Sequence, residues 1–185
     1  MKILWIFLFI VFSNLSYSQH KPIGIPPTVK MLPDSNMVID YTDAQNKAIK
    51  DYLKLNPNLI LVKAENVDRD MKIDNYNYYK NGDMQYQYAC WGDLNNDGYL
   101  DLLVVFKSQK KVNAWGWVTY SLVLLKRSKI GTYESVKLHS FNGGCLSGIL
   151  FHKKDNFIEF YCTGVATGII KLKNGRFIIK KMMGD

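Results

Sequence analysis

Apolar residues recur along this chain in short runs that turn-forming residues separate. One run, Leu102 to Phe106, has five consecutive apolar residues, which is typical of a buried strand. Runs with alternating polarity, or rich in β-branched and aromatic residues, predict further short strands. We expect strands at residues 59–63, 84–90, 102–106, 116–127, 132–139, 146–153, 157–163, 169–173 and 176–180.

One segment has the period of a helix instead. Thr42 with Gln45 three residues later forms a capping-box pattern, and Pro57 ends the pattern, which predicts a helix over residues 43–55. Its apolar face is made by Ala44, Ala48, Ile49, Tyr52 and Leu53. Asn174-Gly175 predicts a tight hairpin between the last two strands. The expected fold is α+β: a predominantly antiparallel β meander with one N-terminal amphipathic helix that covers a sheet.

The first 40 residues differ from the rest. Residues 1–18 have a charged start at Lys2, an apolar core and a small-x-small end at Ser16 to Ser18, which predicts a secretory signal peptide. Residues 19–40 hold four of the five prolines and predict an extended arm. Residues 41–185 then form a single β-rich domain. We expect a secreted or periplasmic protein without a stable membrane span, since Ser13 and Asn14 interrupt the apolar run.

The polar stretch before the central apolar run has the spacing of an ion site. Side-chain oxygens fall at loop positions one, three, five and nine, glycine stands at six, and a backbone carbonyl is available at seven. These residues are Asp93, Asn95, Asp97, Asp101, Gly98 and Tyr99. Ca²⁺ takes six to eight oxygen ligands, so such a loop over residues 93–101 suits it. A calcium-binding EF-hand is excluded, because position twelve is Val104 where the hand needs a bidentate glutamate.

The pattern Asp93-x-Asn95-x-Asp97-Gly98-x-x-Asp101, followed by Leu-Leu-Val-Val, resembles the calcium loop of FG-GAP or VCBS-type repeats, as found in integrin-like β-propeller blades. The resemblance implies Ca²⁺ held by the three acids, the asparagine and the carbonyl of Tyr99, in a loop joining two antiparallel strands. That family usually carries several copies in tandem, whereas this chain has one. The alternative is a polar Asn/Asp/Gly turn without an ion.

Charge is distributed unevenly around the overall +8. Residues 19–101 carry a net −3 and residues 102–185 a net +10. The basic half indicates attraction to an anionic partner such as a polysaccharide, an acidic protein or a membrane face. The alternative is that lysines at strand ends discourage edge-to-edge pairing. Nucleic acid is not expected, because the chain has no recognised binding motif. Residues 65–79 predict a long polar loop and a candidate binding surface.

Three cysteines, Cys90, Cys145 and Cys162, allow one disulfide and one remaining thiol. We expect the disulfide between Cys145 and Cys162, and the alternative is that these cysteines are buried free thiols. Cys145 also lies in a glycine-rich segment with His139 and His152 on either side, which permits a Cys/His hydrolase. The common hydrolase, metalloprotease and nucleotide-binding motifs are absent from the sequence.

These patterns together predict an exported, calcium-stabilised, non-catalytic binding domain for a protein or polysaccharide of the cell envelope. One alternative is an inhibitor or immunity protein that acts against a cell-envelope enzyme. The other alternative is a secreted hydrolase that uses Cys145.

Overall fold

The computed structural model describes residues 21–31, 37–63, 84–86, 88–152, 157–163, 165–173 and 176–181. Its elements are β1 (Thr28–Met31), β2 (Met37–Asp40), α2 (Asp43–Leu55), β3 (Leu59–Leu61), β4 (Met84–Tyr86), β5 (Ala89–Gly92), β6 (Asp101–Lys111), β7 (Val118–Arg127), β8 (Tyr133–Gly143), β9 (Cys145–His152), β10 (Phe157–Thr163), β11 (Val165–Lys173) and β12 (Arg176–Lys181). The expected fold class is confirmed, since antiparallel strands dominate and α2 is the single helix of the described part. The predicted signal peptide, the polar loop at 65–79 and the Asn174-Gly175 turn lie outside the described residues.

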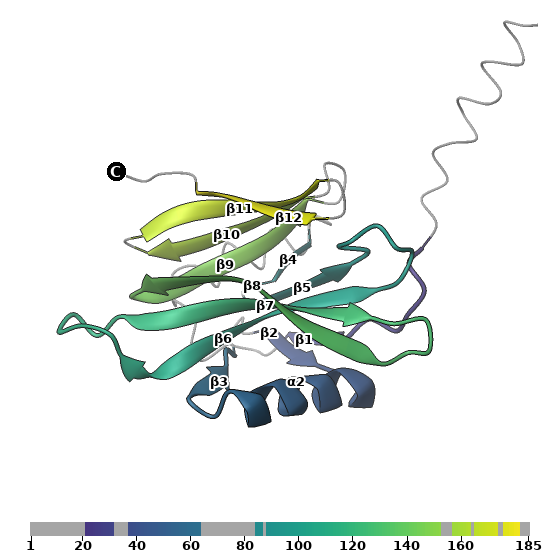
Figure 1. Ribbon diagram of the computed structural model, residues 1–185, viewed down its shortest axis with the longest axis horizontal. Helices are drawn as coiled ribbons and strands as arrows, with labels where there is room; N and C mark the ends of the chain where they lie inside the picture. The colour runs from purple at the N-terminus through teal and green to yellow at the C-terminus, as the bar shows by residue number, and fades with distance from the viewer. Residues whose placement is uncertain are drawn as a thin grey trace, which may run out of the picture.

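The elements form three layers (Figure 1). The central sheet has the order β3-β6-β7-β8, and β5 also pairs with β6. The second sheet has the order β12-β11-β10-β9-β4. Helix α2 lies on one side of the central sheet, where the rings of Tyr52 and Phe106 are 4.8 Å apart. The second sheet lies on the other side, where Phe141 of β8 stacks on Phe160 of β10 at 5.1 Å.

Strand β6 occupies the middle of these layers. All five residues from Leu102 to Phe106 are fully buried. Successive side chains of a strand point to opposite faces, so an unbroken apolar run is the pattern that a strand covered on both faces requires. Leu103 lies opposite Leu124 of β7 and Cys90 of β5 in the two neighbouring pairings. The apolar run therefore fixes β6 as the centre of the core.

The predicted strand 84–90 is divided between the two sheets. β4 pairs with β9 in the second sheet, whereas β5 pairs with β6 in the central sheet. The chain changes sheets between them, and at Gly92 it passes so close to the second sheet that an added Cβ would lie 2.6 Å from Phe151 Cε1. The sequence alternation is continuous across this crossing, so periodicity alone cannot locate it.

The segment 19–40, expected as an extended arm, contains a short hairpin. β1 and β2 pair antiparallel with Thr28 opposite Asp40, and an ion pair joins Lys30 to Asp40. Residues 21–27 have no strand pairing except a single parallel bridge between Ile23 and Tyr99. Among the described residues of the arm, pairing is thus confined to this hairpin and that single bridge.

Helix α2 spans the predicted residues, and its capping box is formed. Gln45 is fully buried and serves three partners. Its Oε1 accepts the Thr42 N–H at 2.9 Å, and its Nε2 donates to the Ile25 carbonyl at 3.2 Å and to the Tyr133 hydroxyl at 3.3 Å. A single amide therefore joins the arm, the start of the helix and β8.

Replacing Gln45 with Leu keeps a similar volume but removes all three hydrogen bonds. We expect the free energy of unfolding to fall by about 1–3 kcal/mol, because the Thr42 N–H and the Ile25 carbonyl lose their partner in a partly buried setting. Urea denaturation measures the change. Gln109→Leu is the matched control, since that amide donates to the Pro57 carbonyl at the exposed surface. Equal losses in the two variants would contradict the assigned role of Gln45.

Candidate metal centre

The predicted ion loop joins two antiparallel strands of the central sheet. Gly92, the last residue of β5, lies opposite Asp101, the first residue of β6. Between them the side chains of Leu94 and Leu100 are 2% and 5% exposed, so both ends of the loop are anchored in the core. The polar residues between these anchors remain at the surface.

Three carboxylates converge in this loop. One oxygen each from Asp93, Asp97 and Asp101 lies within 4.8 Å of the other two. The side chain of Asp93 is half-buried, that of Asp97 exposed and that of Asp101 fully buried. Like charges at this separation repel one another, and a divalent cation between them would remove the repulsion. The cluster can therefore hold a metal ion.

The backbone of the loop is wound around the acidic side chains. Asp93 accepts hydrogen bonds from the N–H groups of Asp97 and Gly98 at 2.9 and 3.0 Å, and Asp97 accepts the N–H of Tyr99 at 3.0 Å. Gly98 has a φ of 84°, a conformation that favours glycine, and Asn96 has a φ of 62°, which asparagine tolerates. The sequence thus holds its carboxylates in a tight turn of defined shape.

Asp101 is the unusual member of the cluster. Its Oδ1 accepts the backbone N–H of Arg127 at 2.9 Å, but its Oδ2 is buried with no hydrogen-bond partner in the described structure. Burial raises the pKa of Asp101 to about 7, and the charges of Asp97 and Asp93 add to the rise, while the Arg127 N–H and Lys126 oppose it. A buried carboxylate oxygen without a partner is costly, and a bound cation is one way to satisfy it.

The N-terminal arm crosses this loop. The Ile23 N–H donates to the Gly98 carbonyl at 2.9 Å, and the Ile23 carbonyl accepts the Leu100 N–H at 3.0 Å. The same carbonyl accepts the Arg127 guanidinium at 3.3 Å, and that guanidinium lies 5.8 Å from the centre of the Tyr99 ring. Residues far apart in the sequence therefore clamp the second half of the loop.

The structure brings together three of the five predicted ligands. Asn95 lies beside Asp97, to which its amide donates at 2.9 Å, while its own oxygen accepts the Asp97 N–H at 2.9 Å. The ligand roles of Asn95 and of the Tyr99 carbonyl stay predictions. Sequence reasoning missed Arg127 and Ile23, because their contact with the loop depends on strand register and on the path of the arm.

The structure does not place a cysteine thiol beside either His139 or His152 among the described side chains. The ring of His139 packs 5.7 Å from that of Phe160, and burial, followed by the charge of Lys137, lowers its pKa. His152 Nε2 lies 3.0 Å from Glu159 Oε2. The side chains of Cys145 and Cys162 lie outside the description, so their disulfide stays a prediction, as does a catalytic Cys145. Cys90 is a buried free thiol whose pKa is raised by burial.

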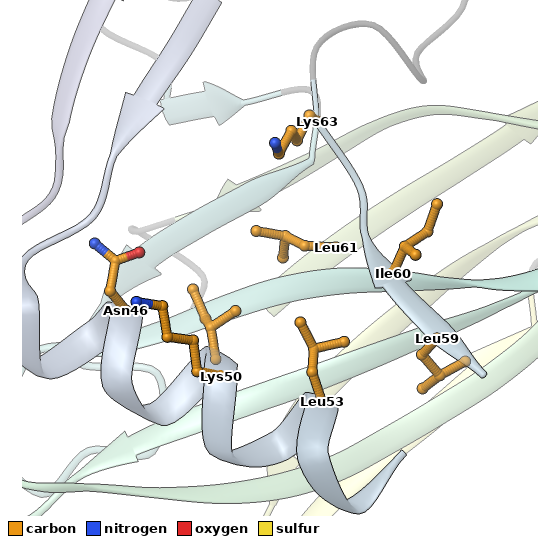
Figure 2. A pocket seen from close by; sticks show the side chains of 8 residues that line it. Asn46, Lys50, Leu53, Leu59, Ile60, Leu61 and Lys63 are labelled. Atoms are coloured by element: carbon orange, nitrogen blue, oxygen red, sulfur yellow. The ribbon is translucent and has the colours of Figure 1, made fainter. Parts of the chain in front are cut away.

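A separate groove lies between α2 and β3 (Figure 2). Its volume is about 390 Å³, and the lining is mostly apolar. The lining residues are Asn46, Ile49, Lys50, Leu53, Leu59, Ile60, Leu61 and Lys63. None of the three clustered carboxylates lines it, so the groove and the candidate metal centre are different places on the molecule.

Comparison of the chain with protein-family models, with curated proteins and with solved structures gives no match. Among the described residues, no helix has both the length and the apolar character needed to cross a membrane. Support for a metal ion in this loop comes from the positions of its carboxylates.

The buried carboxylate predicts an unusual pH dependence of stability in the presence of a chelator. The pKa of Asp101 rises from 3.8 to about 7 on folding, so between these values the folded protein binds more protons than the unfolded chain. Stability should therefore fall as pH rises from about 4 to about 7 and then level off. Asp101→Asn, which keeps an acceptor for the Arg127 N–H, should remove this decline and melt above the wild type at pH 8. Thermal melts at several pH values measure both, and an unchanged pH profile in the variant would contradict the assignment.

The clamp formed by the arm can be tested at Gly24. An added Cβ there would lie 2.8 Å from Leu100 Cβ, so Gly24→Ala should push the arm away from the loop. We expect amide hydrogen exchange at Ile23 and Leu100 to accelerate by about fivefold or more, the factor that about 1 kcal/mol of local stability represents. The neighbouring, exposed Ile25→Ala is the control. Unchanged protection at Leu100 in Gly24→Ala would show that the arm does not cover the loop.

Proposed function

We propose that this protein is an exported domain that binds Ca²⁺ in the loop 93–101 and acts by binding a protein or polysaccharide of the cell envelope, without catalysis. The main observation that supports ion binding is the buried Oδ2 of Asp101. It has no hydrogen-bond partner in the described structure and belongs to a cluster of three carboxylates. Asp93, Asp97 and Asp101 would ligate with their side chains. Asn95 and the Tyr99 carbonyl would add further oxygens, and water would complete the set.

Calcium fits this site better than other common ions. The loop offers oxygen atoms alone, whereas zinc and most transition metals favour sulfur or imidazole nitrogen. Magnesium requires near-ideal octahedral geometry and retains most of its water, while calcium accepts six to eight oxygens in irregular arrangements. The resemblance of residues 93–105 to FG-GAP or VCBS-type loops supports the same ion. A weak site can also be filled outside the cytosol, where calcium sites with dissociation constants of about 10⁻⁴ to 10⁻³ M are used.

The role proposed for the ion is structural. It would hold the turn between β5 and β6 at the point where the arm and Arg127 also contact it. A ligand that binds only the folded state adds about 2.7 kcal/mol of stability at a hundredfold excess over its dissociation constant. Fixing this turn would stabilise the start of β6, which pairs with β3, β5 and β7 in the central sheet.

A binding role follows from the rest of the chain. The signal-like residues 1–18 support export, and the net charge of +10 in residues 102–185 supports an anionic partner. The catalytic alternative needs an activated Cys145 with an imidazole base. His139 is packed against aromatic rings, whereas the contact of His152 with Glu159 is compatible with such a base.

The ion is tested by melting curves with calcium, with magnesium and with a chelator. We expect calcium at a hundredfold excess to raise the midpoint by about 5–10 °C, given about 2.7 kcal/mol and a chain of this size. Asp97→Asn keeps an acceptor for the Tyr99 N–H but removes one charge, so it should abolish most of the shift.

Asp51→Asn is the matched control, because it removes a carboxylate from the exposed face of α2, where Asp51 pairs with Lys47 and Lys54. This variant should keep the full response to calcium. A midpoint that calcium leaves unchanged in the wild type, or a shift that Asp97→Asn retains, would remove the ion from the proposed function.

A further inference from the structure

The turn between β6 and β7 presents a tryptophan almost entirely to solvent. The side chain of Trp115 is 86% exposed, and Val112 in the same turn is 46% exposed. Tryptophan has the largest apolar surface of the side chains and is normally packed against other groups. Figure 1 shows the turn at the end of the β6–β7 hairpin. Trp115 lies in this turn, between Lys111 at the end of β6 and Val118 at the start of β7.

Hydrogen bonds give this tip a defined shape. The Val112 N–H donates to the Trp117 carbonyl at 2.7 Å, and the Asn113 side chain accepts the Trp117 N–H at 3.1 Å. The Gly116 N–H donates to the Asn113 carbonyl at 3.2 Å, and Gly116 has a φ of 81°. The turn is therefore preorganised, and a partner that binds Trp115 need not supply the cost of ordering its backbone.

Two lysines lie at the end of β6, where this turn begins. Lys110 and Lys111 are both exposed, and neither takes part in an ion pair within the described residues. The side chain of Lys111 runs beside Gly116, the residue that follows Trp115, with its Nζ 3.7 Å from where a Cβ would stand. The tip thus combines an exposed aromatic surface with two positive charges that form no ion pair with any other described residue.

We propose that this tip, residues 110–117, binds an acidic polysaccharide. The indole of Trp115 stacks on the apolar face of a sugar ring, and Lys110 and Lys111 pair with the carboxylate or sulfate groups of the chain. The inference rests on the binding role proposed above and names the class of ligand and the surface that takes it. The net charge of +10 in residues 102–185 adds long-range attraction for the same ligand.

A sugar polymer fits this tip better than a lipid surface does. Membrane-surface segments insert a broad apolar face, usually several large side chains on one side of an amphipathic helix. Here the exposed large apolar side chains of the turn are Trp115 and Val112, Trp117 is partly buried, and Asn113, Ala114 and Gly116 are polar or small. One ring with flanking cations matches a ligand that alternates apolar ring faces and anionic groups.

The experiment measures binding of the whole protein to hyaluronan and to heparin oligosaccharides, with neutral dextran as the uncharged comparison. Titration calorimetry gives affinities, and tryptophan emission reports whether the exposed indole becomes covered. We expect binding to at least one acidic glycan, none to dextran, and an affinity that falls as salt rises. Trp115→Ala should weaken binding by about tenfold or more, the range for loss of a central aromatic contact, while Trp115→Tyr retains most of it.

The chain offers a closely matched control. Ile130 is also 86% exposed and stands in the turn between β7 and β8, next to Lys129. Ile130→Ala and Lys129→Gln should leave the affinity unchanged, whereas Lys110→Gln with Lys111→Gln should lower both the affinity and its salt dependence. Equal losses at the two turns would overturn the proposal, as would binding to phosphatidylglycerol vesicles without binding to either acidic glycan.

Failure of this inference can be told from failure of the proposed ion. Glycan titrations are run with calcium and with chelator, beside the melting curves. Suppose glycan binding depends on Trp115 but calcium does not stabilise the protein. That result would support the glycan site at residues 110–117 and contradict calcium binding in the loop 93–101. If calcium stabilises the protein but neither acidic glycan binds, the glycan site is contradicted and calcium binding is supported.

Discussion

The stability of this fold is tied to the state of one carboxylate, placed where the chain enters the buried part of β6. Asp101 is fully buried and is followed by five apolar residues that are fully buried as well. One of its oxygens is satisfied by the Arg127 N–H, which also continues the pairing of β6 with β7. The other oxygen needs either a proton or a cation, because an unpaired buried charge is far more costly than either. Binding of a proton or a cation at the start of β6 can therefore alter the stability of the folded domain.

Contacts of the N-terminal arm extend that influence to the helix. Ile23 exchanges backbone hydrogen bonds with Gly98 and Leu100 in the acidic loop. Two residues later, the Ile25 carbonyl accepts the buried amide of Gln45 at the start of α2. Hydrogen bonds thus run from the loop through residues 23–25 to the helix and, through Tyr133, to β8. An ion that orders the loop would also favour the docked arm, because both depend on the same carbonyl and N–H groups of the loop.

Local features of this fold were predictable from the sequence, and contacts between distant segments were not. The capping box at Thr42 and the bounds of α2 follow from short-range chemistry, and the apolar run after Asp101 correctly predicts a strand covered on both faces. Asp93, Asp97 and Asp101 stand close together in the sequence, and one oxygen from each lies within 4.8 Å of the other two, while their role as ligands stays a prediction. The division of residues 84–90 between two sheets and the contacts of Ile23 and Arg127 depend on register and chain path, which a periodicity of two cannot encode.

Strand β6 also separates the two surfaces that carry the proposed chemistry. Asp101 is its first residue and Lys111 its last, so the acidic loop and the β6–β7 turn lie about 33 Å apart at roughly 3.3 Å per residue. The first six residues of this strand are buried, and close-packed cores do not deform continuously. An ion at Asp101 would therefore affect the Trp115 turn chiefly through the stability of the domain. Because the turn is held by its own hydrogen bonds, its conformation should be the same whenever β6 and β7 are paired, and ligand binding there should track the fraction of folded protein.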